Sequence, residues 1–407
     1  MRLSGALLAL ACTFTAGCKS CNHDSAKGAP SASASAVVIA PSMASSMAAP
    51  TLREIDSTRG FGLPGSCRIE LPIRSAPLPK PEARFVAASG SLDTLLLAQG
   101  TDDTVSGSGL VTLLTGRVAP APWTDLDAPP VVAEGPKGWV YAWTQGEDGG
   151  VGQAALWSDG KASAGPNGDH LEVTDLQCTK DGCALLTSLA RAAEAPGATV
   201  SFSHGASGSV DIATEGAFRP FAIVDTEPKA GRARIALTDG SQVALYGIEA
   251  GEAKHLADVP TPNGVYDVTH GKAPLVVAPG AAETAPCVEG GFPVEIRTPG
   301  GATETVATNA PPDGVIARAL GAGAIIAWIG PASCRFATQR VVHAVVVDAA
   351  GKPLSSAMAV AEASGFALAA NGDRLSLWLA KGDQLVWIRA RCPASSPVGS
   401  PSSRPPG

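Results

Sequence analysis

A repeated pattern of two short apolar runs separated by a glycine turn constrains the fold of this chain more than any other feature. The pattern occurs in FVAASGSLDTLLLAQG, VVAEGPKGWVYAWTQG, VYDVTHGKAPLVVAPG, ARALGAGAIIAWIG and FALAANGDRLSLWLAKG. In each segment the first apolar run ends near a glycine, which supplies the backbone freedom that a tight turn requires. Because a second apolar run follows at once, each segment predicts a β-hairpin.

The spacing of these hairpins predicts the architecture. The middle of each second run is marked by Leu96, Tyr141, Leu185, Ile235, Val276, Ile326 and Leu377. The markers are separated by roughly 40 to 51 residues, as in four-stranded propeller blades. Third runs follow most hairpins, weaker fourth runs occur in SVDIAT and TETVAT, and little is amphipathic at helical period. We predict an all-β domain, a β-propeller of seven four-stranded blades; six or eight blades, or two β-sandwiches, are the alternatives.

The two ends of the repeat region predict how the propeller closes. The last unit shows only three strands, whereas an extra strand, CRIELPI, precedes the first unit. We expect this N-terminal strand to complete the last blade, which would bring Cys67 close to Cys392.

The cysteines fit this map as disulfides. Cys178 and Cys183 flank a predicted hairpin turn, and Cys287 and Cys334 lie in corresponding loops of neighbouring units. An exported chain meets an oxidising compartment, so we predict three bridges, and Cys21 is left over. The competing interpretation is structural zinc, which usually needs paired CxxC knuckles that are absent here. The three predicted disulfides join Cys178 with Cys183, Cys287 with Cys334, and Cys67 with Cys392.

The N-terminus predicts export. Arg2 is followed by an apolar stretch from Leu3 to Phe14, shorter than the roughly 20 residues of a membrane span. The tetrad Thr15-Ala16-Gly17-Cys18 then resembles the bacterial lipobox, although Thr15 replaces the usual Leu or Val. The resemblance implies a lipoprotein cleaved before Cys18 and anchored by acyl chains on that residue. The alternative is a simple secretory signal that leaves Cys18 as an ordinary or disulfide-bonded cysteine.

These observations divide the chain into four parts. We expect a signal peptide over 1–17, a lipidated cysteine with an Ala/Ser/Pro-rich tether over 18–60, the propeller over 61–392 and a disordered tail over 393–407. Lys19, rather than Asp, follows Cys18, which favours the outer membrane in the best-known bacterial systems. The net charge of −7 and the lack of a basic cluster argue against a nucleic-acid partner.

Candidate binding residues lie at the ends of the predicted first strands, which line the channel of a propeller. Carboxylates that converge there can bind a cation, as in propeller lactonases that use calcium. The alternative is that they are solvated turn residues. The candidates are Glu134, Asp175, Asp225, Asp267, His270 and Asn371.

The sequence favours binding over catalysis. It contains no HExxH motif, P-loop, GxSxG elbow or EF-hand loop, and its histidines are scattered. We therefore expect a non-enzymatic propeller that presents loops to an envelope protein or glycan. It resembles, in architecture only, the propeller lipoproteins that assist outer-membrane barrel assembly. A calcium-dependent hydrolase or lyase is the alternative, and a sugar-binding module is a weaker one.

Overall fold

The computed structural model describes sixteen stretches of the chain, and every structural statement below concerns these residues. They are 53–55, 61–65, 67–78, 84–87, 92–100, 105–106, 108–112, 117–120, 125–126, 131–145, 151–158, 161–169, 171–188, 197–202, 208–281 and 286–392. All of them belong to the compact unit that runs from Pro41 to Gly407. Cys18, Cys21, the predicted signal peptide and the predicted tail lie outside the described residues.

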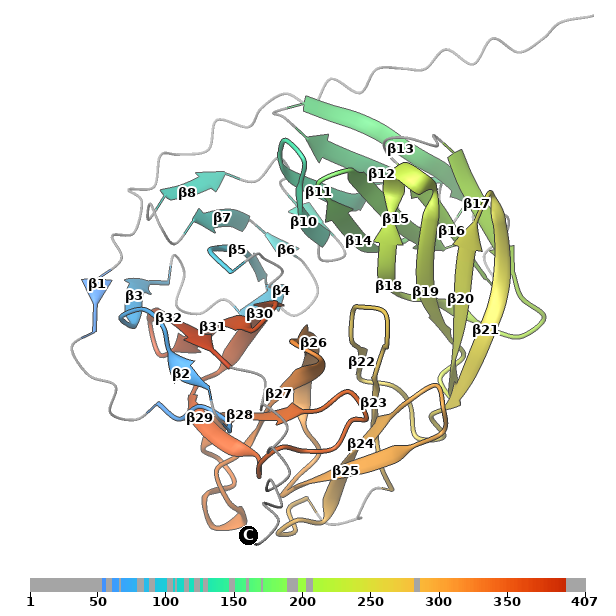
Figure 1. The fold of residues 1–407 in the computed structure, drawn as a ribbon. Helices are drawn as coiled ribbons and strands as arrows, with labels where there is room; N and C mark the ends of the chain where they lie inside the picture. Colours follow the sequence, from blue (N-terminus) through green and yellow to red (C-terminus); the bar gives the residue numbers. More distant parts are fainter. Residues whose placement is uncertain are drawn as a thin grey trace, which may run out of the picture. The chain divides into compact units, whose positions relative to one another are not determined.

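Six sheets of four antiparallel strands follow one another along the chain (Figure 1). The first three are β4 (Arg84–Ala87), β5 (Thr94–Gly100), β7 (Ser108–Thr112) and β8 (Arg117–Pro120); β10 (Val131–Gly135), β11 (Gly138–Gln145), β12 (Val151–Ser158) and β13 (Lys161–Asp169); and β14 (Val173–Thr179), β15 (Gly182–Ser188), β16 (Gly197–Phe202) and β17 (Gly208–Ala213). The next three are β18 (Arg219–Glu227), β19 (Arg232–Thr238), β20 (Gln242–Glu249) and β21 (Glu252–Pro260); β22 (Asp267–Val268), β23 (Val276–Pro279), β24 (Phe292–Arg297) and β25 (Thr303–Thr308); and β26 (Asp313–Leu320), β27 (Gly323–Pro331), β28 (Arg340–Val347) and β29 (Met358–Glu362).

The remaining described strands form two further sheets. A short pair consists of β6 (Val105–Ser106) and β9 (Asp125–Leu126). A six-stranded sheet consists of β30 (Gly365–Asn371), β31 (Arg374–Lys381), β32 (Gln384–Arg391), β3 (Arg74–Pro77), β1 (Arg53–Glu54) and β2 (Arg68–Ile69). The all-β prediction is confirmed, and the seven marker residues all lie in the second strand of their sheets.

The core lies between successive sheets. Strands in the middle of a sheet, such as β27 and β31, are buried along nearly their whole length, whereas the fourth strand β21 is mostly exposed. Middle strands are covered on both faces by neighbouring sheets, which explains their continuous apolar runs. Four tryptophans fill this space, and each is at most 4% exposed: Trp143, Trp328, Trp378 and Trp387.

The N-terminal strands pair with the C-terminal strand. Both β2 and β3 pair with β32, and the Cys67–Cys392 disulfide joins the same ends across 325 residues of sequence. Within the predicted strand CRIELPI (67–73) only β2 is formed, because the chain leaves the sheet between Glu70 and Ile73, and β3 begins directly after this segment at Arg74. β1 lies inside the predicted tether and pairs with β3, so the folded part begins earlier than expected.

Charged side chains surround this junction, and we call them the junction cluster: Glu70, Asp93, Arg374, Arg389 and Arg391. Glu70 contacts Arg374 at 2.9 Å, Arg389 at 3.4 Å and Arg391 at 3.7 Å. Arg389 also pairs with Asp93, which precedes β5 in the first four-stranded sheet. The junction cluster thus connects the last sheet to both the N-terminal strands and the first sheet.

Helices are minor in the described part of the chain. Two 3₁₀ turns are present, η1 (Pro228–Ala230) and η2 (Cys334–Phe336). None of the described residues forms a helix long and apolar enough to cross a membrane.

Candidate binding site

Asp175 on β14 joins its sheet to the next one. Its Oδ2 accepts the backbone N–H of Ile223 on β18 at 2.7 Å, and its Oδ1 accepts the N–H of Leu176 at 2.8 Å. A register shift between Val173 and Asp175 interrupts the pairing of β14 with β15 at this point. The carboxylate therefore holds two first strands side by side.

Asp267 on β22 makes the same connection two sheets further along the chain. Its Oδ2 accepts the N–H of Ala317 on β26 at 2.8 Å, and its Oδ1 accepts the N–H of Val268 at 2.8 Å. The Arg318 guanidinium also donates to Asp267 Oδ2 at 3.1 Å and to the Ala317 carbonyl at 2.8 Å. The contact between these two sheets therefore includes an ion pair between Asp267 and Arg318 in addition to the backbone hydrogen bond.

The two aspartates occupy equivalent positions of the repeat. In its own sheet, each aspartate comes directly before the first-strand residue that pairs with the marker residue of the second strand. In the following sheet, its carboxylate accepts the backbone N–H of the first-strand residue at the corresponding position. The pairs that define this equivalence are Leu176 with Leu185, Ile223 with Ile235, Val268 with Val276, and Ala317 with Ile326.

Gln177 and His270 connect sheets that are not neighbours in the chain. Gln177 Nε2 lies 3.0 Å from the Ile223 carbonyl and 2.5 Å from His270 Nδ1. An amide N–H that donates to Nδ1 leaves the imidazole proton on Nε2. We call Asp175, Gln177, Asp267, His270 and Arg318 the inner cluster.

Burial controls the protonation of the inner cluster. Desolvation raises the pKa of Asp175 to about 6, against the lowering effect of the hydrogen bonds from Ile223 and Leu176. Desolvation also raises the pKa of Asp267, which the charge of Arg318 opposes. The pKa of His270 falls to about 3 because burial and the Arg318 charge both disfavour the imidazolium. At neutral pH the cluster therefore contains a neutral histidine.

The structure brings together only some of the predicted binding residues. Asp175, Asp267 and His270 belong to the inner cluster, whereas Glu134 and Asn371 are exposed at the ends of β10 and β30. Asp225 lies opposite Arg234, after a register shift between Ile223 and Asp225 in β18. A binding role for any of these six residues stays a prediction.

Two members of the inner cluster, Gln177 and Arg318, were not among the predicted residues. The sequence signal that could have identified them is a polar residue inside an otherwise apolar first strand: Gln177 in LQC and Arg318 in ARAL. Such a residue must find a partner when it is buried, which makes it a better indicator than a carboxylate near a turn.

The inner cluster stabilises the packing of neighbouring sheets. The carboxylates of Asp175 and Asp267 already accept backbone N–H groups, whereas calcium needs six to eight oxygen ligands. No group of three or more His, Cys, Asp or Glu side chains among the described residues could hold a metal ion. Calcium binding therefore stays a prediction of the sequence.

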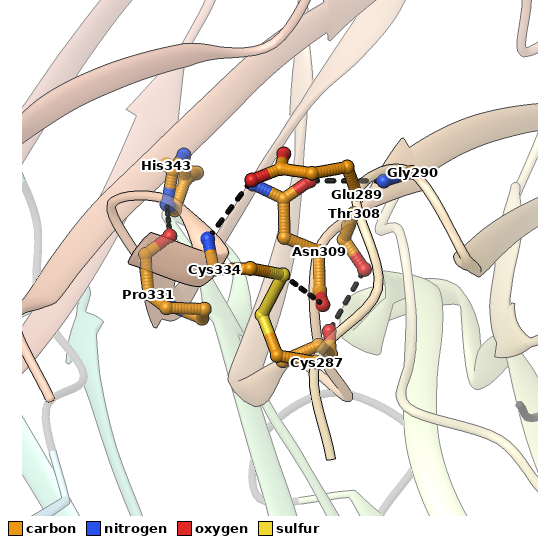
Figure 2. The surroundings of a disulfide bond; sticks show 9 residues. Cys287, Glu289, Gly290, Thr308, Asn309, Pro331, Cys334 and His343 are labelled. Atoms are coloured by element: carbon orange, nitrogen blue, oxygen red, sulfur yellow. Dashed lines mark hydrogen bonds between the residues drawn. A yellow bond between two sulfur atoms is a disulfide. The ribbon is translucent and has the colours of Figure 1, made fainter. Parts of the chain in front are cut away.

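A second site lies where two loops are tied together (Figure 2). Cys287, between β23 and β24, forms a disulfide with Cys334, between β27 and β28. Glu289 Oε1 accepts the Cys334 N–H at 3.0 Å, and Asn309 Oδ1 accepts the Gly290 N–H at 3.0 Å (Figure 2). The disulfide and these hydrogen bonds fix loops from two neighbouring sheets, which we call the tied loops (286–291 and 332–339).

The tied loops present an aromatic side chain to solvent. Phe336 is 54% exposed, the highest value among the large hydrophobic side chains described. The Arg335 guanidinium lies 5.7 Å from the centre of its ring. Residues 335–340 are all exposed, so this pair extends from the fixed part of the loop.

The third disulfide closes the hairpin between β14 and β15. Cys178 and Cys183 are directly opposite each other in the register of these strands. All three predicted cysteine pairs are therefore disulfides in the structure.

Comparison with known proteins shows similarity only at the level of structure. No protein-family model and no curated protein matches the chain. A streptogramin B lyase is similar with a TM-score of 0.49 and 12% identity over 78% of this chain and 97% of that chain. The β-propeller domain of Cps50 (Swd1) from Myceliophteria thermophila gives a TM-score of 0.41 and 12% identity over 77% of this chain and 98% of that domain.

An acylaminoacyl peptidase from Pyrococcus horikoshii is also similar, with a TM-score of 0.42 and 10% identity over 74% of this chain and 52% of that chain. Likenesses this distant carry no information about activity or ligand.

Proposed function

We propose that this protein is an exported lipoprotein, anchored through Cys18, whose single propeller of seven blades binds a protein partner at the bacterial envelope. Its role is that of a rigid binding scaffold rather than an enzyme. We further propose that the anchor lies in the outer membrane.

The observation that carries this proposal is the state of the cysteines. All six described cysteines are in disulfides; two of these bridges join distant parts of the chain, and the third closes a hairpin. Disulfides persist in oxidising compartments and are rare in the cytosol of most organisms. Their presence supports export, in agreement with the lipobox-like tetrad that ends at Cys18.

Strand pairing supports closure into one ring of seven blades. Six sheets have four strands in up-and-down order, and β3 takes the fourth position beside β30, β31 and β32. β30 also contacts β4 of the first sheet, and Arg389 of the last sheet pairs with Asp93. Propellers keep only short, protected edges in this way, and the Cys67–Cys392 bridge would lock the ring.

The tied loops support binding of a protein. Arginine and aromatic residues are enriched among the side chains that dominate protein interfaces, and a preorganised loop loses less entropy on binding. Arg335 and Phe336 match a partner surface with an apolar pocket beside a carboxylate. The carboxylates of the inner cluster, in contrast, are engaged with backbone N–H groups.

The anchor is tested by mass spectrometry of the natively purified protein and by membrane fractionation of a Cys18→Ser variant. We expect acyl chains on Cys18 and release of the variant from the membrane, with a Cys12→Ser variant as the matched control. An unmodified Cys18, or a Cys18→Ser variant that stays in the membrane, would overturn the anchor.

The partner is tested with a photo-cross-linking amino acid placed at position 336 in growing cells, and at Leu354 as the control site. We expect one cross-linked protein from position 336 that disappears with Arg335→Glu or when Cys287 and Cys334 are changed to serine. Cross-links to glycan alone, or equal products from both positions, would contradict a protein partner at the tied loops.

A further inference from the structure

A charged cleft opens on the sheet formed by β18, β19, β20 and β21. It lies at the end of the sheet where the β18–β19 and β20–β21 turns are, and its volume is about 720 Å³. This volume falls within the roughly 300 to 1,000 Å³ of typical ligand sites. The tied loops belong to other sheets and lie between second and third strands, so the charged cleft is a separate site.

One row of side chains across the charged cleft is mainly cationic. In the register of the sheet, Asp225 lies opposite Arg234, Arg234 opposite Gly247, and Gly247 opposite Lys254. Lys272, from the loop after β22, also lines the cleft, and its carbonyl accepts an N–H of Arg234 at 2.7 Å. The row and Lys272 together contain three cations and one carboxylate.

A second row, two residues further along the strands, is mainly anionic. Glu227 lies opposite Arg232, and Glu249 lies opposite Glu252. Arg232 contacts Glu249 at 2.6 Å and Glu227 at 3.6 Å, and this row contains one cation and three carboxylates. The charged cleft therefore has a positive row and a negative row about 7 Å apart, the length of two strand residues.

Gly247 adds no side chain of its own to the cationic row, and Leu256 lies over it. A Cβ atom built at Gly247 would lie 3.3 Å from Leu256 Cδ1. Leu256 is 48% exposed and also lines the cleft. A ligand at this position thus meets Arg234 and Lys254 beside an apolar side chain.

Backbone strain occurs at the same place. Ala250 has a φ of 54° and is the one described residue other than glycine with a positive φ. It lines the charged cleft beside Gly251, in the turn between β20 and β21. A left-handed conformation costs an alanine about 1–2 kcal/mol, and the two-residue turn between β20 and β21 requires it at this position.

We infer that the charged cleft binds a zwitterionic peptide segment. A carboxylate of the ligand contacts Arg234, Lys254 and Lys272 beside Leu256, and an ammonium or guanidinium group contacts Glu249 and Glu252. In an extended peptide, side chains at positions i and i+2 lie on one face about 7 Å apart, which matches the separation of the two rows. The ligand class is therefore a peptide with an acidic and a basic residue in alternate positions.

The test is a nuclear magnetic resonance titration of the full protein with the end-blocked tripeptide Glu-Ala-Lys. We expect saturable binding, with affinity at least about tenfold higher than for end-blocked Glu-Ala-Glu, Lys-Ala-Lys or Ala-Ala-Ala. Equal binding of all four peptides, or no saturable binding of Glu-Ala-Lys, would overturn the inference.

Variants locate the site on the protein. Lys254→Glu and Glu252→Lys should each weaken Glu-Ala-Lys binding about tenfold, whereas Lys352→Glu, an exposed charge outside the cleft, should not. Gly247→Ala should fold, because the nearest atom is the mobile end of Leu256, and should also weaken binding. Its control is Gly208→Ala on β17, where a Cβ atom meets nothing within 4 Å. Unchanged affinity in all three cleft variants would exclude this cleft as the site.

Discussion

The inner cluster and the junction cluster both join sheets, but they do so by different means. In the inner cluster Asp175 and Asp267 accept backbone N–H groups of the following sheet, and the side chains of Asp267 and Arg318 are only 20% and 26% exposed. In the junction cluster Glu70 meets three arginines, of which Arg374 and Arg391 are 41% and 47% exposed. The disulfide beside the junction cluster joins the two ends of the folded chain, whereas the Cys178–Cys183 disulfide next to Gln177 of the inner cluster closes only a local hairpin.

This difference indicates where each part of the fold obtains its stability. Neighbouring sheets are connected by a short loop of chain, so hydrogen bonds from one carboxylate are sufficient to fix their first strands. The N- and C-terminal strands are far apart in sequence, and bringing them together costs much more chain entropy. The partly exposed ion pairs of Arg374 and Arg391 offset little of that cost, and we assign the main stabilising role to the covalent bridge.

The largest expected effect is loss of the terminal bridge. Changing both Cys67 and Cys392 to serine should lower the free energy of unfolding by about 5 kcal/mol, the upper end of the range for disulfides, because the bridge closes a very long loop. Changing both Cys178 and Cys183 should cost only about 2 kcal/mol, because five residues of sequence separate them. Urea unfolding without reductant measures both values, and a larger loss from the hairpin bridge would contradict this assignment.

The next effect concerns the inner cluster. Asp267→Ala should lower the free energy of unfolding by about 2–3 kcal/mol, because it leaves the Ala317 N–H and the Arg318 guanidinium without their acceptor. Asp313→Ala is the control, since Asp313 pairs with Arg340 at a site where both side chains are more than half exposed. That change should cost at most about 1 kcal/mol. Equal losses in thermal or urea unfolding would show that the inner carboxylate does not join the sheets.

The pH dependence separates two members of the inner cluster. The pKa of Asp175 is raised to about 6 in the folded protein, so the folded state takes up its proton first and gains stability as pH falls from 6 to 4. The pKa of His270 is lowered to about 3, so the unfolded state takes up its proton first and stability is lost as pH falls below 6.5. The two contributions oppose each other in this range.

Variants should therefore change the slope of stability against pH in opposite directions. Between pH 6 and 4, Asp175→Asn should lose stability more steeply than the unchanged protein, and His270→Asn less steeply. Chemical unfolding at four or five pH values gives these slopes. Parallel curves for all three proteins would show that neither group titrates as described.

The smallest effect is expected at the exposed edge of the junction cluster. Arg391→Ala should cost less than about 1 kcal/mol, since its contacts with Glu70 at 3.7 Å and Asp373 at 3.4 Å are partly solvated. The loss should vanish in 1 M salt, which screens exposed charges, whereas the loss caused by Asp267→Ala should persist. A salt-independent loss at Arg391 would place it among the groups that hold the ends together.

The sequence was sufficient to predict features that depend on local pattern. Apolar runs and glycine turns located one central strand in each of the seven larger sheets, including those with Tyr141, Leu185 and Ile326. The three cysteine pairs followed once the strands were placed, because a bridge only requires that two loops or strand ends be neighbours.

The contacts of the candidate site could not be predicted, because they depend on register. A shift between Val173 and Asp175 accompanies the contact of Asp175 with β18, and a shift between Ile223 and Asp225 places Asp225 opposite Arg234. The contact between Gln177 and His270 joins residues 93 positions apart. A shift of one residue turns a side chain to the other face of a strand, so spacing alone does not determine which side chains meet.

The most direct test of the closed, exported propeller is peptide mass spectrometry of the natively purified protein, digested without reduction. We expect a single cross-linked peptide that contains Cys67 and Cys392, because β2 and β3 lie beside β32. Free thiols at these positions, or either cysteine paired with Cys178, Cys183, Cys287 or Cys334, would contradict it.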